Sequence, residues 1–230
     1  MLESAATRPD VQSFVADGEA EQLSAPALVG YLTATFGAGL ALACSFQKEE
    51  SVLLDMLLAA DPKARVFALD THVLFDETYA VWRAFEKRYG IEITAYSGPS
   101  LGRQAATHGH ALWSNDPALC CSIRKVGPLA RALSDLDCWI AGVRRDQSPT
   151  RAATPKLGWD EKHELWKASP LADWTDDDVW AYIRERELPV NLLHERGYAS
   201  IGCTHCTAPG EGREGRWSGS DKTECGLHPS

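Results

Sequence analysis

The sequence predicts an α/β fold in which helices cover both faces of a mostly parallel, twisted sheet. Over residues 21–141, short apolar runs of strand length alternate with longer segments of helical periodicity. Strands that alternate with helices favour right-handed crossovers, which place parallel strands side by side and put helices on both faces. The chain has 230 residues, enough for one full-sized domain and short for two.

Periodicity and turn residues place the elements along the chain. Glu21 to Phe36 has the pattern of an amphipathic helix that ends at Gly37, and Leu40 to Cys44 is a continuous apolar run typical of a buried strand. The elements expected next are a helix at 49–60, a strand at 65–69, a helix at 76–89 ended by Gly90, a strand at 91–96, a helix from about 122 to 133 and a strand at 138–141.

The pattern changes after Gly142, where loops predominate and one clear helix is expected at 175–187. Thr175 followed by Asp178 has the spacing of a capping box at the start of that helix. The later part of the chain therefore adds less regular structure to the predicted sheet.

The end of the sequence has the composition of a mobile segment. Residues 210–222 are too rich in glycine and charge to pack as core. We therefore expect a nucleotide-binding α/β domain with a metal site at 1–209 and a flexible C-terminal tail at 210–230 that carries Cys225.

Composition and charge exclude several classes of function. The formal net charge of −9 argues against general nucleic-acid binding. The apolar stretches are too short to cross a bilayer and the first residues lack the layout of a secretory signal, so we expect a cytoplasmic protein without a membrane partner. Seven cysteines in an intracellular chain favour metal ligation and a reactive thiol over a disulfide framework.

Three loops that follow predicted strands carry groups suited to holding a nucleotide. They are Ser45 to Ser51, Asp70 to His72 and Gly142 to Arg151. In a parallel sheet, ligands gather beyond the carboxyl ends of the strands, where such loops lie. We therefore expect the three loops to surround one binding site.

The first of these loops ends at a helix N-terminus, where free backbone N–H groups and the helix dipole favour an anion. Ser45 and Ser51 either add donors to that site or simply cap the helix. The loop resembles the phosphate loop of ATP pyrophosphatases, but Phe46 and Gln47 stand where that loop has glycines. Filled positions leave the backbone less room to wrap a pyrophosphate, so we infer a nucleotide with a smaller anionic end than ATP.

Basic residues gather beside the motifs, which favours an anionic small molecule over a polyanion. They are Arg124, Lys125, Arg144, Arg145, Arg151, Lys156, Arg213 and Arg216. Lys125 lies four residues after Cys121 and so on the same helix face. A cation at that position would link a metal centre electrostatically to a bound anion.

Four cysteines have the arrangement of ligands to one metal centre. Cys203 and Cys206 have a spacing used by zinc and by iron–sulfur ligands, and a thioredoxin-type redox pair is disfavoured because no strand leads into the motif. Cys120 and Cys121 are adjacent, and consecutive side chains diverge by about 100° in a helix. Both can contact one centre only where a helix begins or kinks. The size of a 4Fe–4S cluster tolerates such neighbours better than a single zinc ion, which favours iron–sulfur over zinc.

The other three cysteines lie in different sequence surroundings. Cys44 and Cys138 lie in apolar strands and are expected to be buried and inert. Cys225 lies in the tail, where a thiol is either without function or able to move into a site and out again. The basic residues that would stabilise its thiolate when the tail closes over a site are Arg213, Arg216, Lys222 and His228.

Taken together, these segments resemble the assimilatory sulfonucleotide reductases, specifically the cluster-bearing adenosine 5'-phosphosulfate (APS) reductases of bacteria and plants. The matching segments are residues 45–51, 69–71 with 77–78, 120–125, 144–151, 170–174, 197–206, and 215–217 with 224–228. The chain departs from the family pattern at His72, where glycine is usual, and at 218–220, where aromatic residues are frequent.

The resemblance implies an adenine nucleotide alpha-hydrolase-like fold and a role for each matching residue. Cys225 would be the nucleophile. The ligands of a 4Fe–4S cluster would be Cys120, Cys121, Cys203 and Cys206. Substrate contacts would come from Ser45, Phe46, Gln47, Glu50, Ser51, Leu69, Asp70, Thr71, Lys125, Arg144, Arg145, Arg213, Arg216 and His228.

The implied activity is thioredoxin-dependent reduction of APS to sulfite and AMP, a step of sulfate assimilation and cysteine biosynthesis. The Cys225 thiolate would attack the sulfonyl sulfur, AMP would leave, and an S-sulfocysteine would remain until a second thiol releases sulfite. The other cysteines belong to cluster or core, so that thiol would come from thioredoxin, or from glutaredoxin or glutathione. Members of the family form homo-oligomers, and we expect one here.

Three alternatives are weighed against this interpretation. A reductase of 3'-phosphoadenylyl sulfate (PAPS) has the same chemistry, but members of that type generally lack the two cysteine pairs. A zinc-containing nucleotide alpha-hydrolase that thiolates tRNA would require an intact glycine phosphate loop and usually a basic surface, and the sequence has neither. A non-catalytic iron–sulfur or zinc module leaves Cys225 and the arginine loop at 144–151 unexplained.

Overall fold

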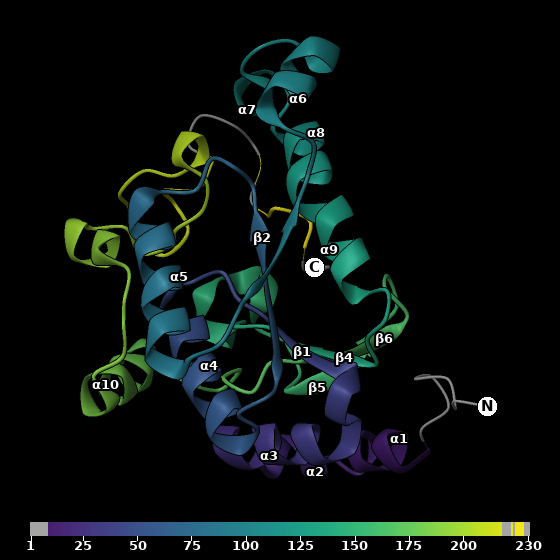
Figure 1. The fold of residues 1–230 in the computed structure, drawn as a ribbon. Helices are drawn as coiled ribbons and strands as arrows, with labels where there is room; N and C mark the ends of the chain where they lie inside the picture. Colours follow the sequence, from purple (N-terminus) through teal and green to yellow (C-terminus); the bar gives the residue numbers. More distant parts are fainter. Residues whose placement is uncertain (1–8, 218–221, 223, 228–230) are drawn as a thin grey trace.

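A six-stranded sheet forms the centre of the protein, with the strand order β3-β2-β1-β4-β6-β5 (Figure 1). The computed structural model describes residues 9–217, 222 and 224–227. The strands are β1 (Leu40–Ala43), β2 (Arg65–Asp70), β3 (Thr94–Ser97), β4 (Cys138–Ile140), β5 (Leu157–Asp160) and β6 (Leu165–Ala168). Neighbouring strands are parallel except β5 and β6, which form an antiparallel pair at one edge. The predicted mostly parallel sheet is confirmed.

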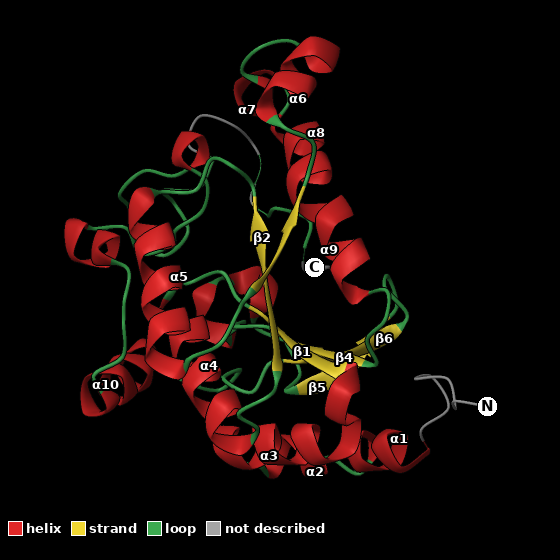
Figure 2. Cartoon of the chain, in the orientation of Figure 1, coloured by secondary structure: helices red, strands yellow, loops and turns green. Residues whose placement is uncertain are grey.

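Helices cover both faces of this sheet, as predicted (Figure 2). They are α1 (Pro9–Ala16), α2 (Glu19–Gln22), α3 (Ala25–Phe36), α4 (Lys48–Ala60), α5 (Asp76–Tyr89), α6 (Leu101–His108), α7 (Leu112–Asn115), α8 (Pro117–Cys121), α9 (Gly127–Leu133) and α10 (Asp176–Arg186). A π-helical turn, Ser122–Val126, joins α8 to α9. Among the described residues, no helix is long and apolar enough to span a membrane.

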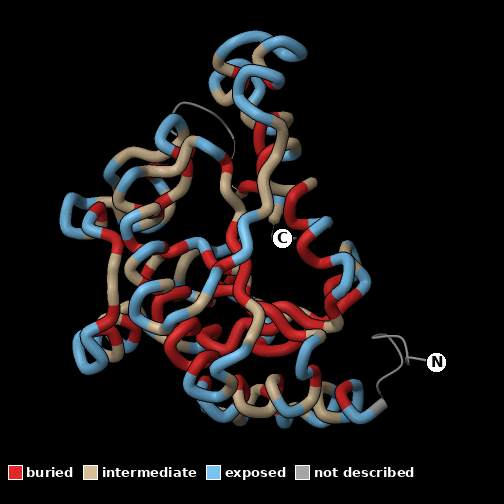
Figure 3. Tube along the Cα trace, viewed as in Figure 1, coloured by how far each residue is buried: buried red, intermediate tan, exposed pale blue. Residues whose placement is uncertain are grey.

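The strands divide the core into two halves. In β1, Leu42 packs in the half that α3, α4 and α5 cover, whereas Ala41 packs in the half under α9. In β4, Ile140 packs in the half under α3, α4 and α5, and Trp139 packs in the half under α9. Successive side chains of a strand point to opposite faces, so a continuous apolar run is buried on both sides. Figure 3 shows the buried strands at the centre, with exposed residues on the outer sides of the helices.

The strand order creates a place for a ligand. From β1 the chain runs outward to β2 and β3, and it then returns to place β4 on the other side of β1. Where the order reverses, the loops that follow the two central strands diverge and leave a crevice at the carboxyl edge of the sheet. The loop after β1 brings Gln47 to this edge, and the loop after β4 brings Arg144.

Some predicted elements have different boundaries, and others were not predicted. The helix expected at 21–36 is divided at Ser24, whose Oγ accepts a hydrogen bond from the N–H of Ala27 (3.4 Å) and begins α3. The strand expected at 91–96 begins only at Thr94. The hairpin of β5 and β6 has four-residue strands, too short for a periodic signal, and it forms because β6 pairs with β4.

Of two local predictions about helix starts, one is confirmed and the other is displaced by five residues. The N–H of Asp178 donates to Thr175 Oγ1 (3.2 Å), and Asp178 Oδ2 accepts from the N–H of Thr175 (2.8 Å), which completes the capping box of α10. The helix expected from about residue 122 instead begins at Pro117 and continues through the π-helical turn.

The described part of the tail packs against the rest of the protein. Trp217 is 4% exposed, and the backbone of Arg216 pairs with Thr207. The expectation that residues 210–222 are too polar to pack as core is therefore wrong for these two buried residues. The reason is that cationic side chains of the tail pack over the Trp217 ring. Arg216 Cζ and Lys222 Nζ lie 4.5 and 5.6 Å from the ring centroid. Flexibility of the tail stays a prediction.

We predict that Leu54→Ala lowers the free energy of unfolding by about 2–5 kcal/mol, because its side chain is fully buried in α4 beneath the binding edge and leaves a cavity. The matched control is Leu192→Ala, which removes the same atoms from a side chain that is 50% exposed and should cost less than about 1 kcal/mol. Urea titration followed by tryptophan fluorescence measures both. Equal losses in the two variants would contradict the assigned core.

Candidate functional site

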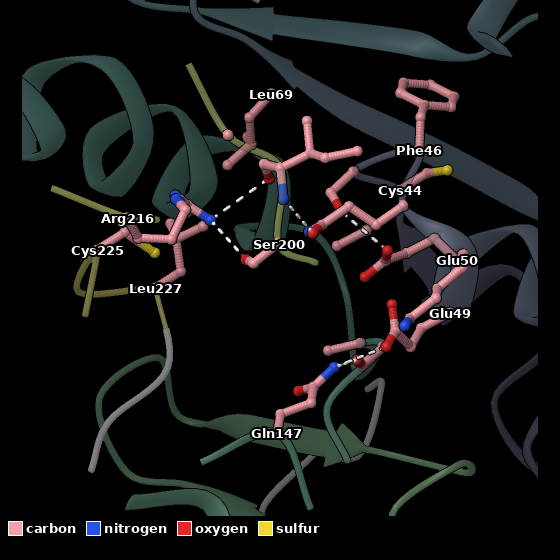
Figure 4. Close-up of a pocket in the computed structure, with 18 of the residues that line it drawn as sticks. Cys44, Phe46, Glu49, Glu50, Leu69, Gln147, Ser200, Arg216, Cys225 and Leu227 are labelled. Atoms are coloured by element: carbon pink, nitrogen blue, oxygen red, sulfur yellow. Dashed lines mark hydrogen bonds between the residues drawn. The ribbon is translucent and has the colours of Figure 1, made fainter. Parts of the chain in front are cut away.

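A cavity of about 400 Å³ lies at the carboxyl edge of the sheet, between the loops that follow β1, β2 and β4 (Figure 4). Residues 199–202 and part of the tail complete its wall. The predicted site residues that line it are Ser45, Phe46, Gln47, Glu50, Leu69, Thr71, Lys125, Arg144, Arg213, Arg216 and Cys225. One cavity thus collects most of the predicted substrate residues and the predicted nucleophile.

The loop after β1 adopts a backbone conformation that is typical of glycine, although it contains no glycine. Phe46 has a φ of 60°, in the left-handed region, and its ring points away from the cavity and stacks on Trp82 with 4.9 Å between centroids (Figure 4). The expectation that Phe46 fills the loop is therefore wrong, because its side chain leaves the loop for the core. Gln47 accepts from the N–H of Ile201 (2.8 Å) and donates to Ser45 Oγ (3.2 Å), which ties the loop to the opposite wall.

Two buried carboxyl groups, Glu49 and Glu50, form one side of the cavity. Ser45 Oγ donates to Glu50 at 2.8 Å, and burial, together with repulsion from Glu49, raises the pKa of Glu50 to about 7. Both effects disfavour the charged form of Glu50. A β-carbon at Gly142 would clash with the Glu49 and Glu50 side chains, so the loop after β4 needs glycine here.

The Arg144 guanidinium is held on the same side by carboxylates. Its Nε donates to Glu49 at 3.0 Å, its Nη1 to Asp146 at 2.6 Å and its Nη2 to Asp176 at 2.9 Å. These partners satisfy its charge within the protein. Arg144 therefore shapes the acidic side of the cavity more than it offers positive charge to a ligand.

The opposite side of the cavity is basic and contains the thiol. The residues there are Lys125, Arg213, Arg216 and Cys225. Arg151 joins the two sides, because it donates to Gln147 Oε1 (2.6 Å) next to Glu49 and also to Glu224 next to Cys225. Arg216 donates to Ser200 Oγ (3.2 Å), while its Nε has no hydrogen-bond partner among the described residues. In Figure 4, Arg216 and Cys225 lie across the cavity from Glu49 and Glu50. The cavity thus has an acidic end and a basic end.

Cys225 is 8% exposed and packs against Cys121 and Trp217. It therefore lies between the large cavity and the predicted metal ligands. The tail carries it there, next to Leu227, which also lines the cavity.

The four predicted metal ligands come together. Cys120, Cys121, Cys203 and Cys206 line one small cavity. The adjacent pair ends α8, and the π-helical turn follows directly, so the prediction that this pair lies at a helix start or kink is confirmed. Thr71 Oγ1 lies 3.3 Å from Cys203 Sγ. No three His, Cys, Asp or Glu side chains in the described part of the chain are placed to hold a single metal ion.

The grouping of these thiols changes their acidity. Burial, and then repulsion from the other thiolates, raises the pKa of Cys120 to about 11. Burial raises the pKa of Cys121 and of Cys206 as well. The thiolates of this group therefore require nearby positive charge.

Arg124 and Lys125 supply positive charge next to the four thiols. Arg124 is 1% exposed and donates from Nη1 to the carbonyl of Thr71 (2.8 Å), while its Nε and Nη2 have no partner among the described residues. Lys125 lines both cavities. Burial lowers its pKa, but Cys203 and Cys225 outweigh this effect and raise the pKa above its usual value.

Ser51 and Asp70, two of the predicted substrate residues, do not line the cavity. Ser51 Oγ donates to the carbonyls of Gln47 (3.2 Å) and Pro189 (3.0 Å), which anchors the start of α4. Neither it nor Ser45 caps that helix, since the cap position is Gln47, whose side chain makes no capping hydrogen bond to the helix. Asp70 accepts from the hydroxyl of Tyr79 at 2.7 Å.

Arg145 also lies away from the cavity wall. It donates to Glu21 (2.7 Å) and to the carbonyl of Thr154 (2.9 Å), because consecutive side chains of the loop after β4 point in different directions and Arg144 faces inward. His228 lies outside the described residues.

Several residues of the cavity wall are absent from the predicted site. The charged or amide-bearing ones are Lys48, Glu49, Asp146, Gln147, Arg151 and Asp176. Arg151 was expected among the basic residues of its loop, but a single arginine on a loop is more often solvated surface. Only the folded tail reveals that Arg151 pairs with Glu224, directly before Cys225.

Comparison with known proteins shows the family of this chain. The phosphoadenosine phosphosulfate reductase domain matches residues 39–209. A Salinibacter ruber protein named adenosine 5'-phosphosulfate reductase is 45% identical over 210 residues, which is 89% of this chain and 83% of the relative. A Gloeobacter violaceus protein named phosphoadenosine 5'-phosphosulfate reductase is 44% identical over 216 residues, 90% of each chain.

A solved structure shares the fold as well. The phosphoadenylyl-sulfate (PAPS) reductase from Candida auris, crystallised as a phosphate complex, superimposes with a TM-score of 0.73 at 29% identity and covers 81% of this chain and 91% of that one. With most of its length matched at this level, the chain belongs to the phosphoadenosine phosphosulfate reductase family.

Proposed function

We propose that the protein reduces adenosine 5'-phosphosulfate to sulfite and AMP, with Cys225 as the nucleophile. The observation that carries this proposal is the basic end of the cavity, where Lys125, Arg213 and Arg216 surround a thiol beside the four-cysteine group. The relative named adenosine 5'-phosphosulfate reductase supports the choice of substrate. Sulfate assimilation and cysteine biosynthesis are the metabolic setting that this reaction serves.

The two ends of the cavity orient the nucleotide. The phosphosulfate carries negative charge, so it belongs at the basic end beside Cys225. The adenosine then extends toward Ser45, Gln47 and Leu69, where backbone groups and apolar side chains line the wall. This orientation brings the sulfonyl sulfur to the thiol.

The first step is a displacement at sulfur. The Cys225 thiolate forms a bond to the sulfonyl sulfur, the bond from that sulfur to the phosphate oxygen breaks, and AMP leaves with the electron pair. Lys125 and Arg216 stabilise the charge that develops on the sulfonyl and phosphate oxygens. The product is an S-sulfocysteine at Cys225.

The second step requires an external dithiol. A thiolate attacks the Cys225 sulfur and releases sulfite, and the second thiol of the donor resolves the mixed disulfide. The sulfonyl sulfur gains two electrons, and the donor leaves as a disulfide. Cys138 is fully buried, and Cys44 lines the cavity but lies across it from Cys225 (Figure 4). Burial also raises the pKa of Cys44 well above its usual value, which disfavours its thiolate. Among the described residues we therefore identify no resolving thiol, and a thioredoxin-type donor fits the need.

The four cysteines that line the small cavity are the donor set of a 4Fe–4S cluster, and we propose that Cys120, Cys121, Cys203 and Cys206 would hold one. Such a cluster with four thiolates would be an anion. The Nε and Nη2 of Arg124, which have no partner among the described residues, would provide donors for it. When bound, it supplies a fixed negative charge beside Lys125 and requires no change of oxidation state in the two steps above.

PAPS is the second candidate substrate, because a relative of comparable identity bears the name of a PAPS reductase. The additional 3'-phosphate would bring two more negative charges into a cavity whose end away from Cys225 has more carboxyl groups than cations. The carboxyl groups there are Glu49, Glu50, Asp146 and Asp176, and the cations paired with them are Lys48 and Arg144. The acidic end therefore favours APS. A homo-oligomer remains our expectation for the assembly.

We predict that mixing the protein with APS adds one sulfonate to Cys225 and to no other cysteine. Peptide mass spectrometry under anaerobic conditions measures the adduct. Cys225→Ser should abolish both the adduct and sulfite release, whereas Cys138→Ala, a change at a fully buried thiol, should retain both. Sulfite release by Cys225→Ser at the normal rate would refute the mechanism.

The cofactor proposal predicts about four iron and four sulfide per chain and a brown colour in anaerobically purified protein. Cys203→Ser should lose most of the iron because it removes one ligand, while Cys138→Ala should keep it. Colorimetric iron and sulfide assays provide the measurement. A colourless preparation that contains zinc and still reduces APS would rule the cluster out.

Steady-state kinetics should give a kcat/KM for APS at least about tenfold above that for PAPS, which corresponds to about 1.4 kcal/mol of discrimination. The physical reason is repulsion of the 3'-phosphate at the acidic end. Glu49→Gln would be expected to reduce the ratio, and Glu161→Gln, at an exposed position away from the cavity, should leave it unchanged. A preference of the unaltered protein for PAPS would reverse the assignment.

A further inference from the structure

A carboxylate of the tail is paired with two arginines that line the cavity. Glu224 accepts from Arg151 in a two-pronged pair, Nε to Oε1 at 3.1 Å and Nη2 to Oε2 at 3.1 Å. Arg213 Nη2 donates to the same Oε2 at 2.9 Å. One carboxylate is therefore shared by two guanidinium groups that both line the substrate cavity.

These two arginines need an anion. Their side chains are 10% and 16% exposed, and Arg216 and Lys125 add further positive charge to the same wall. Burial, followed by repulsion from Arg151, lowers the pKa of Arg213 to about 10, which reflects this crowding. A cation pair that lacked a counter-anion here would be strongly destabilised.

The donors that hold Glu224 suit a phosphosulfate equally well. A guanidinium fork pairs with a carboxylate and with a phosphate or sulfonate group through the same two N–H directions. Glu224 has one negative charge, whereas the phosphosulfate of APS has two. Exchange of the carboxylate for the substrate would therefore neutralise the crowded cations more completely.

We propose that Glu224 is an internal anion that fills the Arg151 and Arg213 subsite in the ligand-free protein and that the anionic end of the substrate displaces it. The proposal rests on the proposed function, because it takes APS as the ligand. Arg151 thereby becomes part of the anion subsite together with Arg213.

The displacement also moves the nucleophile. Glu224 precedes Cys225, and adjacent Cα atoms are about 3.8 Å apart, so any backbone movement of the tail that withdraws the carboxylate from its arginines also moves the thiol. In this structure Cys225 packs against Cys121 and Trp217. On the far side of the thiol, Lys162 Nζ donates to the carbonyl of Gly226 (2.8 Å) and keeps that part of the tail in place. Binding of the substrate is thus coupled to repositioning of Cys225.

The test measures binding rather than turnover. In the unreactive Cys225→Ser background, Glu224→Gln should lower the dissociation constant for APS about tenfold in anaerobic calorimetry, because the competing charge is gone. The matched control, Glu211→Gln, removes the same charge from an exposed position of the same tail and should leave the constant unchanged. Unchanged or weaker APS binding by the Glu224→Gln protein would overturn the proposal.

A second measurement uses the ligand-free protein with Cys225 present. Iodoacetamide should alkylate Cys225 about fivefold faster in Glu224→Gln than in the unaltered protein or in Glu211→Gln, as read from the Cys225 peptide by mass spectrometry. An unchanged alkylation rate would contradict the role of Glu224 in holding the thiol. Absence of any APS binding in the Cys225→Ser protein would instead refute the proposed function, so the two failures are distinguishable.

Discussion

Positive charge buried around one thiol is the constraint on which this site depends. Lys125, Arg151, Arg213 and Arg216 line the same cavity wall, and each requires an anion because burial removes the water that would otherwise solvate it. The protein supplies some of these anions itself, through Glu224 and the four-cysteine group. The positive charge that these anions do not neutralise faces the cavity and favours an anionic substrate.

The sheet explains why these groups meet. Residues of the loops after β1 and β4 reach the cavity because the strand order reverses between those strands, and the buried strands hold both loops in place. The π-helical turn between α8 and α9 directs Lys125 to the wall between the substrate cavity and the cysteine cavity. The tail then closes the remaining side with Arg216, Trp217 and Cys225.

The acidic and basic ends of the cavity have different functions. At the acidic end, Glu49 and Asp176 neutralise Arg144 and leave little positive charge for a ligand. At the basic end, Arg216 retains an Nε without a partner among the described residues. Under the proposed function, this asymmetry would orient a nucleotide that carries its charge at one end and would place its reacting sulfur beside Cys225.

The sequence by itself determined the parallel sheet, the grouping of four cysteines and most residues of the cavity, because strand runs, loop positions and ligand spacing are local patterns. It did not determine the inward direction of Arg144 against Arg145, the departure of Phe46 from the loop, or the hairpin of β5 and β6, which depends on β4. The pairing of Arg151 with Glu224 joins residues 73 positions apart. Only tertiary packing decides such contacts, because the partner of a buried charge is whichever oppositely charged group the fold places next to it.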